Sequence, residues 1–296
     1  AMHSRLHAMQ DAFLSNRTLV AASGSLYPYV NPMLCPEEDY NCYFLPTTSC
    51  TMEDVGQSEA RGKDTFGLDR VVTWKRKGGK NLSNATELSQ PYGMGWFHKE
   101  LTRFLFRPNS RLQATINKLS SQLGLEGGYV SMHYRSGFIL KTEGKRQPLE
   151  LFVRVLKRLK EKLLPVHKVF FMSDDPNAID DIRAAAPGFD IVTVEAALFA
   201  SSKASPKQHI IDFLTNYQWK GDEDEALMVS AVMFLLGGGD YAIAALSSNL
   251  GRTTYELMGT KQFPPHFYDV DNDIWFDGGV GPANMVCTGY GHSNGK

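Results

Sequence analysis

Short apolar runs alternate with amphipathic segments throughout the second half of the chain, and this pattern limits the fold more than any other feature. The apolar runs have the length of buried strands, whereas the segments between them have helical spacing. Strands are expected at 129–133, 168–172, 190–194 and 241–246, and helices at 149–163, 178–186, 223–236 and 250–258. Such alternation is typical of a parallel sheet with right-handed crossovers. The sequence therefore predicts an α/β fold.

The first half is less regular. We expect a helix that ends at Leu14, followed by a strand at 17–22 that opens a first α/β layer. Residues 61–98 are rich in Gly, Lys, Asn and Ser, and a segment of that length without periodicity indicates a functional or poorly ordered loop. Helical spacing returns at 99–123.

A chain of 296 residues is long for one core, which favours one large or two modest domains. The segment 124–128, Gly-Leu-Glu-Gly-Gly, is the best candidate for a boundary. We therefore predict an N-terminal α/β domain over residues 1–125, with a Cys-rich loop, and a Rossmann-like domain over residues 126–296.

Charge and hydropathy exclude several classes of partner. The net charge is −1, so no bulk polyanion such as nucleic acid is expected as a partner. No run of 18 apolar residues is present, so no membrane span is expected in this chain. The start at Ala1-Met2 does not resemble a secretory signal, and a native anchor would have been removed. The sequence does not indicate an oligomeric state.

Three of the four cysteines lie close together, at Cys35, Cys42 and Cys50, while Cys287 is near the end. Their spacing does not fit common zinc templates, so a disulfide within the cluster is favoured over free thiols. Acceptor triplets for N-glycosylation begin at Asn16, Asn81 and Asn84. Such triplets also arise by chance, but together with the cysteines they favour the lumen of the secretory pathway.

Polar side chains follow three of the expected strands. They are His133 and Arg135, Asp174 and Asp175, and Ser247 and Ser248. Because ligands bind at the carboxyl edge of parallel sheets, we expect these side chains to form one site. A guanidinium and a helix start after two serines are both suited to phosphate. The sequence therefore predicts a phosphate-bearing ligand.

Each of these residues also has a structural interpretation. One serine is expected to cap the helix that follows, which is compatible with anion binding. The two aspartates either cap the next helix, orient Arg135 or accept hydrogen bonds from a sugar. Glu143, in the loop after Arg135, is either a solvated charge or a general base. The spacing of the carboxylates does not suggest a metal site, so none is expected.

At these residues the chain resembles the α1,6-fucosyltransferases, which include the animal core enzyme and the bacterial nodulation enzyme and are related to protein O-fucosyltransferases. The similar motifs are V-S-M-H-Y-R-S-G, F-M-S-D-D-P, L-S-S-N-L-G-R-T-T-Y-E-L-M and H-F-Y-D-V-D-N-D-I-W-F-D-G-G, within residues 129–280. The resemblance implies a GT-B-like fold with two Rossmann-like domains. It also implies inverting transfer of fucose from GDP-fucose to a glycan hydroxyl without a metal or another cofactor, in the Golgi lumen.

The resemblance assigns a role to individual residues. His133 falls where the family contacts guanine, Arg135 where it binds the β-phosphate, and Glu143 on the general base. Ser248 falls at a diphosphate contact. The remaining matches to the nucleotide-sugar site are Asp174, Asp175, Ser247, Asn249 and Arg252, and Tyr255 and Glu256 match the helix that follows.

Three positions depart from the family pattern. Ser136 replaces a second arginine, and Ile139 replaces a lysine that assists the leaving phosphate, a role that Lys141 could fill. Val232 replaces an aspartate that recognises the guanine base. These departures leave open two alternatives, a non-catalytic nucleotide- or glycan-binding relative and a transferase that uses another nucleotide sugar.

Overall fold

The computed structural model contains two compact units. It describes residues 2–14, 18–20, 24, 26, 28–54, 93–136, 147–163, 167–175, 177–204, 210–261 and 265–271. The first unit comprises Ala1–Lys118 and Glu195–Val232, and the second comprises Leu119–Val194 and Met233–Lys296. The predicted domain boundary after residue 125 stays a prediction.

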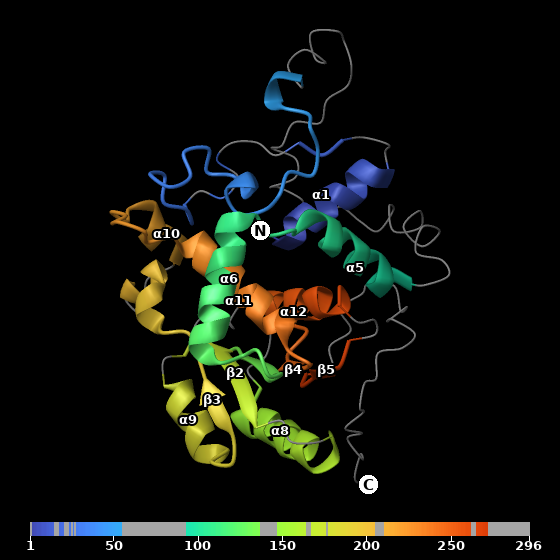
Figure 1. Ribbon diagram of the computed structural model, residues 1–296, viewed down its shortest axis with the longest axis vertical. Coiled ribbons are helices and arrows are strands. Elements are labelled where there is room, and N and C mark those ends of the chain that lie inside the picture. Colours follow the sequence, from blue (N-terminus) through green and yellow to red (C-terminus); the bar gives the residue numbers. More distant parts are fainter. Residues whose placement is uncertain are drawn as a thin grey trace. The chain divides into compact units, whose positions relative to one another are not determined.

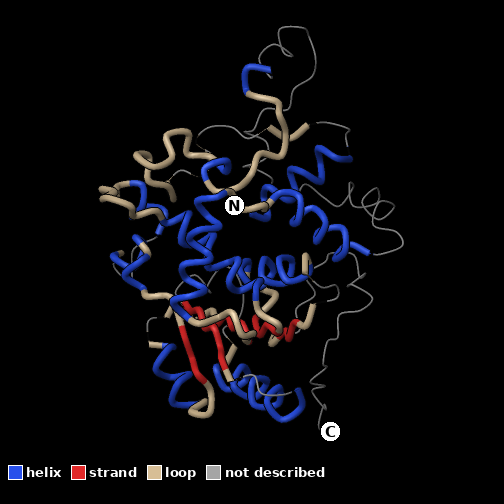
Figure 2. The backbone as a smooth tube through the Cα atoms, viewed as in Figure 1, coloured by secondary structure: helices blue, strands red, loops and turns tan. Residues whose placement is uncertain are grey.

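A five-stranded parallel sheet forms the centre of the second unit (Figure 2). Its strands are β1 (Val130–Tyr134), β2 (Lys168–Ser173), β3 (Asp190–Val192), β4 (Tyr241–Ala244) and β5 (Phe267–Asp269), in the order β3-β2-β1-β4-β5. Every neighbouring pair is parallel, so all five carboxyl ends lie at one edge. The predicted α/β fold with a parallel sheet is confirmed.

Helices cover both faces of this sheet (Figure 1). On one face α8 (Leu149–Leu163) and α9 (Ala178–Ala185) bury the side chains of Val130, Met132 and Tyr134. On the other face α12 (Asn249–Gly259) packs on β4. Because side chains alternate along a strand, Ser131 and His133 point to the face opposite Met132.

The first unit is helical in its described part. It contains α1 (Met2–Leu14), α5 (Gly93–Leu105), most of α6 (Ser110–Leu123), α10 (Ile210–Thr215) and the start of α11 (Glu225–Gly238). Short 3-10 helices are η1 (Tyr40–Cys42), η2 (Ala196–Leu198) and η3 (Ala200–Lys203). Within the described ranges no named strand belongs to this unit, and an isolated antiparallel bridge joins Phe44 and Pro108.

Two predictions about the first half are wrong. Residues 18–20 of the predicted strand at 17–22 have no regular structure, while the rest of that segment lies outside the described residues. The predicted helix at 99–123 is two helices, because Pro108 interrupts it and the Asn109 side chain caps α6 by accepting from the N–H of Leu112 at 3.0 Å. The first of them begins at Gly93, inside the segment 61–98 that showed little periodicity.

The predicted elements of the second half are confirmed, with ends that shift by no more than two residues. The strand β5 was not predicted, because Phe267–Asp269 is too short to show a period. The segment 195–232 belongs to the first unit and so interrupts the second in sequence.

A disulfide between Cys35 and Cys42 confirms the predicted cross-link, and Cys50 is an exposed thiol. Cys287 lies outside the described residues. Such a bond fits a secreted or luminal protein. No helix in the described ranges is long and apolar enough to cross a membrane.

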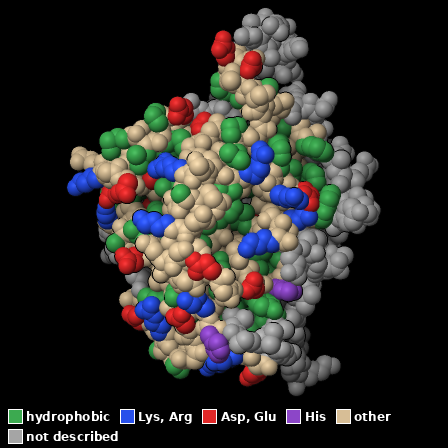
Figure 3. Space-filling model, in the orientation of Figure 1, with side chains coloured by type: hydrophobic (Ala, Val, Ile, Leu, Met, Phe, Trp, Pro, Cys, Tyr) green, Lys and Arg blue, Asp and Glu red, His purple; other side chains and the backbone are tan. Residues whose placement is uncertain are grey.

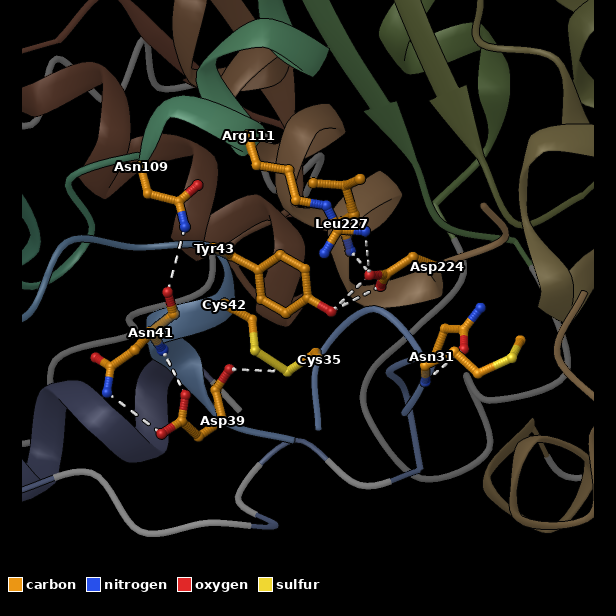
Figure 4. The surroundings of a disulfide bond; sticks show 11 residues. Asn31, Cys35, Asp39, Asn41, Cys42, Tyr43, Asn109, Arg111, Asp224 and Leu227 are labelled. Carbon is orange, nitrogen blue, oxygen red and sulfur yellow. Dashed lines mark hydrogen bonds and ion pairs between the residues drawn. A yellow bond between two sulfur atoms is a disulfide. The ribbon is translucent and has the colours of Figure 1, made fainter. Parts of the chain in front are cut away.

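Next to the disulfide, a buried hydrogen-bond network joins distant parts of the first unit (Figure 4). The Tyr43 hydroxyl lies 2.8 Å from both carboxylate oxygens of Asp224, and Arg111 donates to Asp224 at 3.0 Å. Asp224, which is 2% exposed, also accepts from the N–H of Leu227 at the start of α11. Burial and the neighbouring carboxylate raise the pKa of Tyr43, so Tyr43 stays the donor.

Candidate functional site

The carboxyl edge of the sheet brings the predicted site residues of three strands together. Strand β1 lies between β2 and β4, so the segments that follow these strands are neighbours. Arg135 follows β1, whose last residues include His133, while Asp174 and Asp175 follow β2, and Ser247 and Ser248 lie in the turn after β4. The predicted common location is therefore observed, while the ligand-binding role of each residue stays a prediction.

His133 is buried at the end of β1 and is only 3% exposed. Its Nδ1 atom is buried and has no hydrogen-bond partner within the described part of the chain. Burial lowers the pKa of His133 to about 4, helped by Arg135 and opposed by Asp174. The imidazole is therefore neutral at neutral pH, and its open nitrogen can hydrogen-bond to a ligand.

Asp174 connects β2 to the segment that follows β1. One carboxylate oxygen lies 3.6 Å from Nε of Arg135, and the other accepts from the N–H of Ser136 at 2.9 Å. The first contact orients the guanidinium, as one of the sequence-based interpretations expected.

Asp175 does not cap α9, because the N-cap residue of that helix is Asn177, and the alternative interpretation of Asp175 as a helix cap is wrong. Its Oδ1 atom accepts from the N–H of Asn177, next to the start of α9, at 3.0 Å. Its Oδ2 atom accepts from the hydroxyl of Ser136 at 2.9 Å. Ser136 therefore binds both aspartates.

Ser248 is the N-cap residue of α12, but its side chain makes no capping hydrogen bond. The hydroxyl is buried and has no partner among the described residues, and Ser248 is 4% exposed. The first N–H groups of a helix have no intrahelical partner and carry partial positive charge. A buried hydroxyl beside such a helix start is suited to an anion.

The approach of α12 to the preceding turn depends on Gly251. A Cβ atom at this position would lie 2.1 Å from the carbonyl oxygen of Ala245. Only glycine therefore allows the first turn of the helix to pack so closely on the end of β4.

Arg252 and Asn249 support the turn in this structure. Nη1 of Arg252 lies 3.1 Å from the carbonyl oxygen of Leu246 and 3.5 Å from that of Ser247. Its Nη2 atom donates to the side-chain oxygen of Asn249. Tyr255 and Glu256, further along α12, are both buried. Nucleotide binding by Arg252 and Asn249 stays a prediction.

Sequence reasoning missed Asp269, the last residue of β5, and Asp271, two residues further on, both of which reach the same turn. Their carboxylates accept from the N–H of Leu246 at 3.1 Å and 3.2 Å, and Asp271 also accepts from the N–H of Ser247 at 3.1 Å. Burial, and then the neighbouring Asp271, raise the pKa of Asp269 to about 8. The sequence did contain a signal for them, because two aspartates stand two positions apart at the end of a short apolar run.

Several predicted features lie outside the described residues. They are the proposed base Glu143, Lys141 and the altered position Ile139. In the ranges that are described, no group of three or more His, Cys, Asp or Glu side chains could hold a metal ion. The expectation of a metal-free site stays a prediction.

A cavity of about 640 Å³ opens in the first unit. Its lining is mainly apolar and comes from α1, α5 and the segments around residues 18 and 48: Met9, Phe13, Thr18, Leu19, Thr47, Thr48, Trp96, Phe97, Glu100, Leu101 and Phe104. On the face of the molecule in Figure 3, basic and acidic side chains are interspersed, and the described residues form no continuous basic patch there.

No family model matches the chain. Among solved structures, POFUT1 in complex with GDP-fucose aligns with a TM-score of 0.51 at 13% sequence identity, over 90% of this chain and 93% of that chain. The chain has a fucosyltransferase-like fold. This agrees with the GT-B-like fold implied by the sequence motifs.

Two further alignments have lower scores. NodZ α-1,6-fucosyltransferase soaked with GDP-fucose aligns with a TM-score of 0.44 at 17% identity, over 85% of this chain and 86% of that chain. The apo form of POFUT1 aligns with a TM-score of 0.36 at 13% identity, over 58% of this chain and 49% of that chain. In the latter alignment the chain spans about half the length of its relative. The fold assignment rests on the first of the three alignments.

Proposed function

We propose that this protein is a glycosyltransferase that transfers fucose from GDP-fucose to a hydroxyl group of a glycan. The proposal rests on two buried polar atoms without hydrogen-bond partners in the described chain, Nδ1 of His133 and Oγ of Ser248. Buried polar groups are normally paired, so two open ones at the same sheet edge indicate a ligand site. The fold match to POFUT1 in complex with GDP-fucose supports the choice of ligand.

The diphosphate of the donor would bind at the start of α12. Ser248 Oγ and the first N–H groups of the helix donate to phosphate oxygens, and Arg135, held by Asp174, adds a positive charge. In the proposed binding mode, the neutral imidazole of His133 hydrogen-bonds to the guanine base.

Transfer would proceed in one step. The acceptor oxygen attacks the anomeric carbon as the bond to the β-phosphate oxygen breaks, so the configuration inverts and GDP leaves. Glu143 takes the proton of the acceptor hydroxyl. Arg135, Lys141 and the helix N-terminus stabilise the charge that develops on the diphosphate, and this supports a mechanism without a metal ion.

The compartment belongs to the same proposal. We place the protein in the lumen of the secretory pathway, in the Golgi, where nucleotide-sugar transfer to glycans and an oxidised Cys35–Cys42 pair are compatible.

A second candidate function is nucleotide binding without transfer. Ser136 uses both its N–H and its hydroxyl to bind Asp174 and Asp175, so the altered position has a structural role. Val232 is buried in α11, and its apolar side chain has no group that could hydrogen-bond to a base. Both observations favour a site that lacks two of the polar groups found in the fucosyltransferases that the motifs resemble, an arginine at position 136 and an aspartate at position 232.

Calorimetry and a transfer assay separate the candidates. We expect GDP and GDP-fucose, but not UDP, to bind without added metal, and a ligand at 100 times its Kd to stabilise the fold by about 2.7 kcal/mol. For transfer, fucosylation of a glycan mixture and release of GDP are measured together. Glu143→Gln should keep GDP binding and lower the transfer rate about 10²–10⁴-fold. Glu150→Gln, at the exposed start of α8, is the matched control and should change neither.

Each result has a distinct meaning. GDP binding without any transfer would support the non-catalytic candidate. Selective binding of UDP would exclude GDP-fucose as the donor. Full transfer activity in a folded Glu143→Gln variant would refute the assigned general base.

A further inference from the structure

Two carboxylates hold the turn that precedes the predicted phosphate-binding helix. Asp269 Oδ1 and Asp271 Oδ1 share the N–H of Leu246, at 3.1 Å and 3.2 Å, and Asp271 Oδ2 accepts from the N–H of Ser247 at 3.1 Å. Asp269 Oδ1 also accepts from the N–H of Asp271 at 3.3 Å. The two side chains are therefore close together and bind the same short segment.

Arg252 holds the same segment from its carbonyl side. The guanidinium donates to the carbonyl oxygens of Leu246 and Ser247, whose N–H groups are bound by the carboxylates. The peptide unit between Leu246 and Ser247 is thus bound at both its N–H and its carbonyl oxygen. The next residue is Ser248, whose buried hydroxyl has no hydrogen-bond partner among the described residues.

The charge on this pair depends on pH. Burial and the proximity of Asp271 raise the pKa of Asp269 to about 8, so one proton remains on the pair at neutral pH. Of the elements packed beside the pair, α12 contributes the charged side chain of Arg252. Strand β4 contributes backbone groups and, over residues 242–244, only apolar side chains.

We propose that Asp269 and Asp271 are positioning residues that share one proton, hold the Leu246–Ser247 turn in place, and allow Ser248 and the start of α12 to bind a diphosphate while the pair carries a single negative charge. This inference rests on the proposed function, because the anion is the diphosphate of the donor. It adds two residues and a proton to that site.

Linkage between proton binding and diphosphate binding gives the direction in which the affinity changes with pH. A bound diphosphate is negative and lies next to the pair, so it favours the protonated form and its binding takes up a proton. Affinity is then highest below the pKa of the free pair and falls as the pH rises through it. Above pH ~7 the terminal phosphate is already fully ionised, because its second pKa is about 6.

The two aspartates differ in a way that mutagenesis can use. Asp269→Asn replaces a protonated acid with a neutral amide that can still accept from Leu246 and donate to Asp271. Asp271→Asn instead turns one of two accepting oxygens into a donor. Either the N–H of Ser247 then loses its acceptor, or the N–H of Leu246 faces an amide N–H and keeps only Asp269 as its acceptor. Asp190→Asn, at the amino end of β3 beside Lys168, is the control.

Calorimetric titration with GDP at pH 7 and pH 9 measures the effect. We expect the affinity of the wild type and of Asp190→Asn to fall about fivefold between these pH values, which is the change expected when binding raises the pKa of the pair by one unit from about 8. Asp269→Asn should bind with the same affinity at both, and Asp271→Asn should bind weakly at both. The nucleotide itself titrates in the same way in every experiment, so its contribution cancels when the variants are compared with one another. An equal fall in the wild type and Asp269→Asn would overturn the proposal.

Amide hydrogen exchange tests the turn without any ligand. The N–H groups of Leu246 and Ser247 should be protected in the wild type and in Asp269→Asn, and should lose about tenfold or more of that protection in Asp271→Asn. Equal protection in all variants would overturn the positioning role. If the wild type does not bind GDP at pH 7, the proposed function fails, and hydrogen exchange alone decides whether the carboxylates hold the turn.

Discussion

Replacing Ser248 with alanine should stabilise the free protein and weaken nucleotide binding. The hydroxyl is buried and makes no hydrogen bond within the described chain. Its desolvation therefore destabilises the folded protein, because no hydrogen bond offsets it. That cost is about 1–3 kcal/mol for a buried, unpaired hydroxyl. Removing an N-cap serine normally costs ~0.5–2 kcal/mol, but here the side chain makes no capping bond that could be lost.

The two effects have opposite signs. We expect the free energy of unfolding to rise by about 1 kcal/mol, which raises Tm by roughly 2 °C in a protein of this size. A hydrogen bond to a charged group contributes about 1.5–3 kcal/mol, so the affinity for GDP should fall about 10- to 150-fold. Urea denaturation and calorimetric titration of the same preparations give both quantities.

Ser131→Ala is the matched control. Ser131 is also fully buried in the second unit, but its hydroxyl lies 3.3 Å from the carbonyl oxygen of Tyr241, within hydrogen-bond reach. This variant should lose about 1 kcal/mol of stability and keep its affinity for GDP. A Ser248→Ala protein that is destabilised and binds GDP as the wild type does would refute the assignment of the open hydroxyl to a ligand.

Three further predictions concern stability. Gly251→Ala places a Cβ atom 2.1 Å from the Ala245 carbonyl oxygen, so it should cost ~2 kcal/mol or more, and a urea midpoint equal to that of the wild type would contradict the close packing. Tyr43→Phe removes a buried hydrogen bond to a carboxylate and should cost about 1.5–3 kcal/mol by the same assay, without changing the affinity for GDP. The pKa of His133 is about 4 in the folded protein and about 6.5 when unfolded, so the unfolded state binds more protons between these values. Its contribution to stability is therefore lost as the pH falls from 6.5 to 4, and the free energy of unfolding of His133→Asn should depend less steeply on pH over that window.

The second half of the fold could be predicted because each element carries its own signal. Buried parallel strands such as β2 are continuous apolar runs, and helices such as α8 place their apolar residues on one face. Since every strand is parallel, the order of polar residues after the strands also predicted which of them share an edge. His133, Arg135 and Ser248 were located by that reasoning alone.

Contacts between distant residues could not be predicted. Nothing in the local sequence indicates that Tyr43 binds Asp224, 181 residues later, or that Ser136 binds Asp174 and Asp175. Asp269 ends a strand of three residues and Asp271 follows it, and such a strand is too short for a period to be seen. These side chains depend on tertiary packing, and that packing is not encoded in neighbouring residues.

The central position of β1 has a consequence for synthesis of the chain. Its two neighbours are β2, which follows within forty residues, and β4, whose first pair with β1 joins Val130 to Tyr241. A ribosome that has made β1, β2 and β3 must therefore add the whole segment 195–232 before β1 can pair on its second side. During that interval β1 is an unpaired apolar edge, which other chains can join. Nascent or truncated chains that end before β4 should aggregate, and this protein should fold slowly and benefit from chaperones that cover strand edges.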